Sequence, residues 1–116
     1  MVPNPVEFSQ EWVAAWNSHD LDRILSHYTD DFQMSSPYAT QMAGSQSGVL
    51  KGKETVGAYW RTALERLPDL QFKLINVYVG ADSLAIHYHG AMGKTAIETF
   101  FFANDGRVNR ATATYL

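Results

Sequence analysis

Hydrophobic residues recur at every third or fourth position in three segments of the chain, and this spacing predicts three helices. The first helix is expected to begin after Asn4, whose side chain can cap it, and to end near 17–19. A second, short helix is expected after Asp20, and a third runs from Gly52 to the helix-breaking Pro68. The apolar faces are formed by Phe8, Trp12, Ala15 and Trp16, by Leu21, Ile24, Leu25 and Tyr28, and by Val56, Trp60, Ala63, Leu64 and Leu67.

The later part of the chain changes to a period of two, which is the pattern of strands that bury one face. Asn104-Asp105-Gly106 is a strong hairpin signal, and glycines mark the other turns. Strands joined by such short turns predict an antiparallel meander. The expected strands are 70–79, 83–90, 94–103 and 107–115, and an earlier short strand is expected at 32–35.

Residues 38–50 have neither a helical nor a strand period. We therefore expect an irregular loop that is unusually long for a compact domain. Loops of this length often cover active sites. The sequence leaves open whether this one is a lid over a pocket or a surface insertion without a role.

Composition narrows the class of protein. A chain that is 46% hydrophobic and 18% charged fits one globular domain over 1–116. The net charge of −3, without any cluster of Lys and Arg, gives no electrostatic basis for binding nucleic acid or an anionic membrane. The lack of cysteine excludes disulfides and thiolate nucleophiles. No signal-peptide pattern and no membrane-length apolar run are present, so a cytoplasmic location is expected by default.

Several short motifs follow one another in an order that is distinctive as a set. They are Trp16-Asn17-Ser18-His19-Asp20, Tyr28-Thr29-Asp30-Asp31-Phe32, Ser36-Pro37, Gly52-Lys53-Glu54, Pro68-Asp69-Leu70 and Asp105-Gly106-Arg107-Val108. Together they resemble the nuclear transport factor 2-like superfamily, and within it the SnoaL-like and ketosteroid isomerase-like proteins. The resemblance implies an α+β fold: a cone-shaped roll of three N-terminal helices packed on a curved, mainly antiparallel sheet with an internal pocket. It also implies a small-molecule ligand, but the fold hosts isomerases, cyclases, dehydratases, epoxide hydrolases and non-enzymes, so it does not name the chemistry.

The ketosteroid isomerase-like proteins use three groups that can be compared with this chain. Their catalytic carboxylate before the proline that follows the first strand is replaced by Ser36, which cannot abstract a proton unaided. Their tyrosine on the first helix is replaced by Trp12. Their strand-borne protonated aspartate corresponds to Glu98. With one role of three filled, isomerisation by that mechanism is not expected.

Glu98 also stands out on residue grounds, because every other acid lies on an expected helix or turn. A carboxyl group desolvated in an apolar strand has a raised pKa and can work as a general acid or base. A two-residue turn at Met92-Gly93 would pair His87 with Glu98 across two strands, whereas a slip of one residue would move His87 to the other face. Glu98 and His87 are therefore the candidate catalytic residues. The alternative is that both face water.

The candidates for a pocket wall are mainly aromatic. They are Trp12, Trp16, Ser36, Tyr38, Trp60, Phe100 and Tyr115, although the aromatic residues among them fit an ordinary core equally well. Small inward side chains at Ala111 and Ala113 would leave space for a ligand. His87 and His89 form half of a possible metal site, but no further ligands are visible in the sequence, so neither a metal nor a cofactor is expected.

Three functions remain open at this point. The first is an acid–base enzyme, of isomerase, cyclase or hydratase/dehydratase type, that acts on a small, largely apolar or amphipathic molecule. The second is a ligand-binding domain without turnover. The third is a structural dimerisation module with a filled core. The sequence does not name the ligand.

A homodimer is expected from strand alternation. If Glu98 faces the pocket, Ile97 and Phe101 face outward, and the predicted pairing sends Leu84, Ile86 and Tyr88 the same way. A contiguous apolar face of this kind is rarely left in water, and no later segment of this sequence remains to cover it. A second copy packed through the outer sheet face is the simplest cover.

Overall fold

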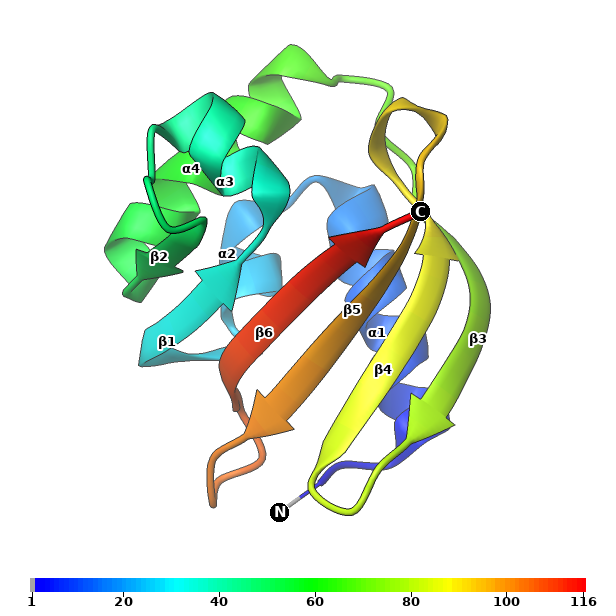
Figure 1. Ribbon diagram of the computed structural model, residues 1–116. Helices are drawn as coiled ribbons and strands as arrows, with labels where there is room; N and C mark the ends of the chain where they lie inside the picture. Colours follow the sequence, from blue (N-terminus) through cyan, green and yellow to red (C-terminus); the bar gives the residue numbers. More distant parts are fainter. Residues whose placement is uncertain (1) are drawn as a thin grey trace.

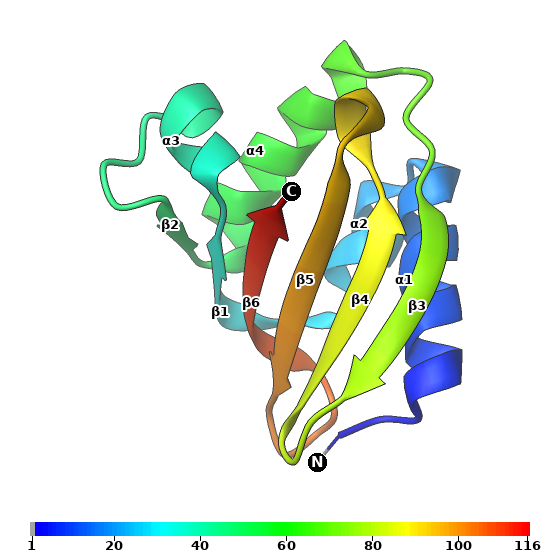
Figure 2. The same cartoon turned by 45° about the vertical axis from the view of Figure 1, so that its right-hand side comes forward.

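The computed structural model describes residues 2–116 as one sheet of six strands with helices packed against one face (Figure 1). The helices are α1 (Pro5–Ser18), α2 (Leu21–Leu25), α3 (Pro37–Ala43) and α4 (Lys53–Arg66), with one short 3₁₀ turn, η1 (Ala91–Gly93). The strands are β1 (Tyr28–Ser35), β2 (Val49–Lys51), β3 (Lys73–Val79), β4 (Ser83–His89), β5 (Thr95–Phe102) and β6 (Val108–Tyr115). Figure 2 shows α1, α2 and α4 behind the sheet, with α3 at the end of β1.

The predicted helix starts are confirmed at atomic detail. The side chain of Asn4 accepts a hydrogen bond from the Glu7 amide at 3.0 Å and caps α1. Asp20 caps α2 in the same way, through the Arg23 amide at 3.2 Å. Helix α4 ends directly before Leu67, where Pro68 prevents its continuation.

Asn17 links the end of α1 to the segment that leads into β3. Its side-chain oxygen accepts from the Phe72 amide at 2.6 Å, and its side-chain nitrogen donates to the Phe72 carbonyl at 3.0 Å. The ring of His19, at the left-handed end of the helix, lies 2.7 Å from the Leu70 carbonyl oxygen. These contacts fix Leu70 and Phe72 against the helix layer.

The strand order is β2-β1-β6-β5-β4-β3. The antiparallel meander predicted for β3 to β6 is confirmed, and β2 pairs antiparallel with β1. Strands β1 and β6 run parallel, with Met34 opposite Ala111. This mixed pairing brings the N-terminal strand to the last one, so that β1 and β5 flank β6.

The expectation of an irregular loop over 38–50 is wrong. The segment contains α3 and β2, and β1 begins at Tyr28, four residues earlier than predicted. The Ser36 hydroxyl accepts from the Tyr38 amide at 3.1 Å to start α3, and Gly44 ends it at φ 72°. Periodicity could not reveal this helix because Ala39 is its only buried residue.

The predicted pairing of His87 with Glu98 is also wrong. Strands β4 and β5 are joined through residues 90–94, and Ile86 therefore lies opposite Glu98 while His87 lies opposite Ile97. With a two-residue turn, each residue of β5 would have paired with the β4 residue one position later in the sequence, so that Glu98 would have faced His87 and not Ile86. Because side chains alternate, this single residue moves His87 to the outer face of the sheet.

The same shift changes the outer face. Leu84, Ile86 and Tyr88, which were expected outside, are buried on the inner side. Ile97 stays outside and is 37% exposed, while the Arg110 guanidinium covers the Phe101 ring at 4.1 Å. The remaining outward positions near them are mostly small or polar: Ala85, His87, Thr99, Thr112 and Thr114.

The homodimer stays a prediction, and Ile97 is now its best test. We expect light scattering at micromolar concentration to show a dimer, and Ile97→Arg to produce a monomer, because a charge at the centre of the outer face would be desolvated on association. Val6→Arg, an equivalent change on the exposed side of α1, is the control and should leave the dimer intact. A monomeric wild type, or a dimer that tolerates Ile97→Arg, would contradict this interface.

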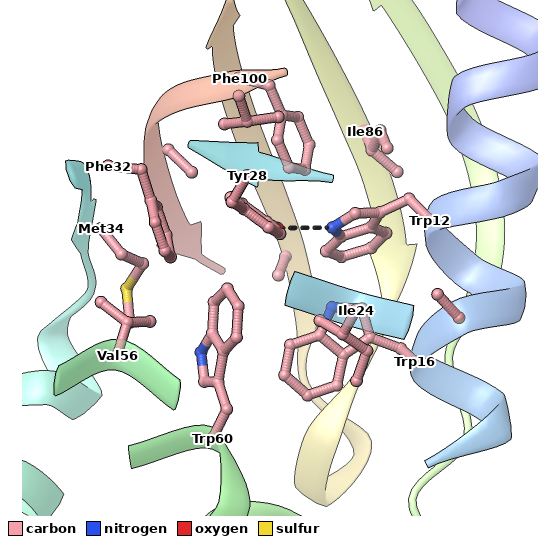
Figure 3. Packing of buried hydrophobic residues seen from close by; sticks show 14 of the residues in the cluster. Trp12, Trp16, Ile24, Tyr28, Phe32, Met34, Val56, Trp60, Ile86 and Phe100 are labelled. Atoms are coloured by element: carbon pink, nitrogen blue, oxygen red, sulfur yellow. Dashed lines mark hydrogen bonds between the residues drawn. The ribbon is translucent and has the colours of Figure 1, made fainter. Parts of the chain in front are cut away.

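The core lies between the helices and the inner sheet face and is mainly aromatic. Figure 3 shows Trp12, Tyr28, Phe32 and Trp60 meeting there from α1, β1 and α4. The ring centroids of Tyr28 and Trp60 are 5.2 Å apart, and those of Tyr28 and Phe32 are 4.4 Å apart. None of the helices described within 2–116 combines the length and apolar character needed to span a membrane.

Candidate functional site

A cavity of about 240 Å³ lies between the helix layer and the ends of β4, β5 and β6. Its wall is mostly apolar and aromatic, and it opens toward the solvent. Helix α3 contributes Tyr38 and Met42, so the segment expected to be a loop does reach the cavity, but as a helix. The cavity wall also includes Met92 of η1, whose backbone φ is 57°.

Six of the seven residues predicted to bind a ligand line this cavity. They are Trp12, Trp16, Ser36, Tyr38, Trp60 and Tyr115. The seventh, Phe100, is fully buried in the core, where its ring lies edge-on to Phe8 and Trp12 at centroid distances of 5.1 and 5.4 Å. Phe100 is therefore a core residue and not part of the cavity lining, and its contact with a ligand stays a prediction.

The two candidate catalytic residues lie on opposite faces of the sheet. Glu98 lines the cavity, whereas the His87 ring packs outside against Tyr78 with 6.4 Å between ring centroids. His87 Nδ1 is buried there without a hydrogen-bond partner. Since His87 cannot reach Glu98 through the sheet, the predicted acid–base pair is not formed. Within residues 2–116, no three His, Asp or Glu side chains gather as a metal site.

Glu98 is the central polar group of the cavity. It is 7% exposed, and β5 holds it opposite Ala113 of β6, whose small side chain leaves space in front of the carboxyl group. Burial raises the pKa of Glu98 to about 7, and the hydrogen bond from Tyr88 opposes that rise. Both the acid and the carboxylate are therefore populated near neutral pH.

Tyr88 holds the carboxyl group in place. It lies on β4 next to β5, and its hydroxyl donates to Glu98 Oε1 at 3.1 Å. Burial and the nearby Glu98 raise the pKa of Tyr88 well above its ordinary value, so the phenol remains protonated and donates. The sequence pattern missed Tyr88 because the assumed turn sent it outward; the correct register would have found it.

Other phenols surround Glu98 at longer range. Desolvation, and then the charge of Glu98, raise the pKa values of Tyr28, Tyr59 and Tyr115. These residues come from β1, α4 and β6 and therefore converge only in the fold. They supply hydroxyl groups and no further negative charge.

The Trp12 indole is not a free donor. Its Nε1 donates to the Tyr28 hydroxyl at 3.0 Å, deep in the core, as the dashed line in Figure 3 shows. The donor role that tyrosine plays at this position in ketosteroid isomerase-like proteins is thus unavailable to a ligand. The face of the Trp12 ring still contributes apolar wall.

One basic side chain lines the cavity among the residues described. Arg66, at the end of α4, is exposed at the opening and was not singled out by the sequence analysis. Tyr59 and Phe72 were missed too, although Tyr59 directly precedes the predicted wall residue Trp60. No sequence signal marks Phe72, which reaches the wall through the Asn17 contacts.

Comparison with known proteins gives a consistent family. The profile of the SnoaL-like domain matches residues 9–114. A SnoaL-like protein of unknown function from Burkholderia thailandensis E264 is 57% identical; the match covers 97% of this chain and 93% of that chain, with a TM-score of 0.94. No protein of curated function matches the chain.

More distant structures share the fold. A nuclear transport factor 2-like protein of unknown function from Cytophaga hutchinsonii is 12% identical, with 100% of this chain and 92% of that chain covered and a TM-score of 0.72. SalBIII, an epoxide hydrolase/cyclase-like enzyme with a role in pyran ring formation in the polyether salinomycin, is 14% identical. Its match covers 97% of this chain and 90% of that chain, with a TM-score of 0.74.

Proposed function

This chain belongs to the SnoaL-like domain family of the nuclear transport factor 2-like superfamily, and from that premise we propose that it is an acid–base enzyme acting on a small, largely apolar molecule. The observation that carries the proposal is Glu98, a buried carboxyl group with a pKa of about 7 on the wall of an apolar cavity. General acid–base catalysis is most effective when the pKa of the catalytic group is near the working pH.

The chemistry that fits this site is proton transfer at one face of the substrate. The Glu98 carboxylate removes a proton from carbon or oxygen, and the resulting acid returns that proton at another atom. The electron pair left by the first proton shifts within the substrate, so the sum is an isomerisation that requires no cofactor. Tyr88 fixes one carboxyl oxygen through its hydroxyl, which leaves the other oxygen of Glu98 for the substrate.

The size of the cavity limits the substrate. An apolar cavity of about 150 Å³ holds benzene, so about 240 Å³ suits a molecule of one or two rings. The wall offers aromatic faces from Trp12, Trp16 and Trp60, together with a few hydroxyl groups. A compact, mostly apolar molecule with one polar function near Glu98 matches this lining.

The relationship to SalBIII supports the proposal at the level of the fold alone. That protein shows that this architecture hosts epoxide hydrolase/cyclase-like chemistry. A fold shared at 14% identity does not transfer a substrate, so the argument rests on the site.

One observation favours a second candidate function, a binding domain without turnover. Glu98 is the only acid on the cavity wall among the described residues, and His87, the expected partner, lies outside. A single titratable group can bind and orient a ligand without completing a reaction cycle. Binding without proton exchange would identify this second function.

The proposal is tested with the bicyclic ketone 1-tetralone, whose α-hydrogens report proton transfer by exchange with D₂O. We expect the wild type to accelerate exchange, with a rate that follows a group titrating near pH 7, and Glu98→Gln to lower the rate by roughly 10²–10⁴-fold. Binding is followed separately by the indole N–H signals of Trp12, Trp16 and Trp60.

Two control variants separate chemistry from folding and binding. Glu65→Gln makes the same change on the exposed side of α4 and should leave exchange unchanged. Ala113→Leu fills the space opposite Glu98 and should abolish binding while the carboxyl group remains. If the indole N–H chemical shifts do not change when 1-tetralone or related bicyclic compounds are added, the cavity does not bind such molecules and the proposed function is wrong.

A further inference from the structure

Among the residues described, the cavity lining contains one acid and one base, and these two groups can carry opposite charges. Glu98 lies buried on β5, whereas Arg66 is exposed at the opening, where α4 ends beside η1 (Figure 1). The rest of the lining is mostly apolar and includes Trp16, Leu67 and Leu70. A bound molecule that fills this space would therefore meet a cation at one end and a neutral or half-ionised acid at the other.

Arg66 lines both the cavity and an adjoining surface hollow. The two spaces also share Leu67, Leu70 and Met92. The apolar cavity thus continues into a more polar opening at this point. An amphipathic molecule fits this arrangement, with its apolar part in the cavity and its charged end at the opening, toward water.

The Arg66 guanidinium is free to take a ligand. Among the residues described, the ion pairs formed by arginine and lysine use Arg23, Lys53 and Arg107, and Arg66 forms none. Of the residues that the structure describes, Asp69 is the one acid that lines the adjoining hollow. Its carboxylate weakens attraction for an anion there, so the opening suits a single negative charge.

We propose that the substrate is a monocarboxylic acid whose carboxylate contacts Arg66 while its apolar body extends along the cavity to Glu98. This inference rests on the proposed function, and it adds the substrate class and its orientation. The planar guanidinium presents paired N–H donors that match a carboxylate. The reverse orientation would place two carboxyl groups together in an apolar site, where at least one must be neutral.

The test compares two probes that share a ring system and differ in charge, 1-naphthylacetate and 2-(1-naphthyl)ethanol. Affinities are measured with the full chain from the indole signals of the three tryptophans on the wall. We expect the wild type to prefer the carboxylate, and Arg66→Gln to weaken carboxylate binding roughly three- to tenfold, as for an exposed charged contact, while the alcohol binds unchanged. The preference should shrink as salt rises.

Two further variants make the result specific. Arg61→Gln removes the same charge from the same helix, but Arg61 lines a different hollow and should change neither affinity. Asp69→Asn removes the opposing acid and should strengthen carboxylate binding.

The outcomes distinguish this inference from the proposed function. Equal effects of Arg66→Gln and Arg61→Gln, or a wild type that prefers the alcohol, would overturn the substrate class while the acid–base site stands. If both probes and 1-tetralone leave the indole signals unchanged, the pocket function fails and this inference fails with it.

Discussion

The stability of the folded protein is expected to decrease by about 3 kcal/mol between pH 4.5 and pH 8 because of Glu98. Its pKa is 4.5 in the absence of the fold and about 7 in the cavity, and one pH unit between two such values corresponds to about 1.4 kcal/mol. Between these values the folded state binds more protons than the unfolded state, so stability falls as pH rises. The loss is complete once pH has passed through the folded pKa.

Glu98→Gln isolates this contribution. The amide cannot ionise, and its oxygen can still accept the hydrogen bond from Tyr88. The variant should therefore gain stability relative to the wild type as pH rises, by about 2–3 kcal/mol between pH 5 and pH 8 in urea unfolding. Arg23 and Arg107 lower the pKa values of Glu11 and Asp105, which also makes stability depend on pH. Because both groups are present in the wild type and in the variant, their contributions cancel in the difference between the two proteins.

Direct titration provides the second measurement. The carboxyl carbon of Glu98 should titrate near pH 7 by NMR. Glu65→Gln, at an exposed position, retains Glu98 and should therefore show the same pH dependence of stability as the wild type. A midpoint for Glu98 near 4.5, with parallel pH profiles for the wild type and Glu98→Gln, would show that the carboxyl group is hydrated and not desolvated in the cavity.

Truncation of Phe100 should produce the largest loss of stability. Its side chain is fully buried between β5 and α1, with Phe8 and Trp12 against its ring. Phe100→Ala removes those contacts and leaves a space that the surrounding aromatic rings cannot fill, which typically costs about 3–5 kcal/mol. Urea unfolding of the wild type and the variant at the same pH measures this cost, because the ionisation of Glu98 contributes to both proteins.

Tyr78→Ala is the matched control for this prediction. Tyr78 is also aromatic and on a strand, but it lies outside and is 48% exposed, so its removal should cost much less. If Phe100→Ala instead retained the wild-type stability and bound larger ligands, Phe100 would belong to the cavity wall as the sequence suggested.

The local physics of this chain is readable from its sequence. Asn4 and Asp20 cap helices because their short side chains accept from amides two or three residues ahead, and this geometry is independent of the rest of the fold. The period-two pattern of the later strands identifies the meander for a similar reason. Glu98 could be singled out because an acid in such a strand must be exposed or desolvated, and its motif context favoured desolvation.

Only the tertiary structure decides which groups meet Glu98. The connection through residues 90–94 is longer than the tight turn expected from its glycines, and one residue of register exchanges the two faces of β4. That exchange brings Tyr88 to the carboxyl group and sends His87 outside. Arg66 reaches the same cavity because the packing of α4 against β1 and α2 places the end of that helix there, although Pro68 alone determines at which residue the helix stops. The local sequence pattern determines whether a segment forms a helix or a strand. Strand register and helix packing depend instead on contacts between residues far apart in the chain. The candidate site is built from those long-range contacts.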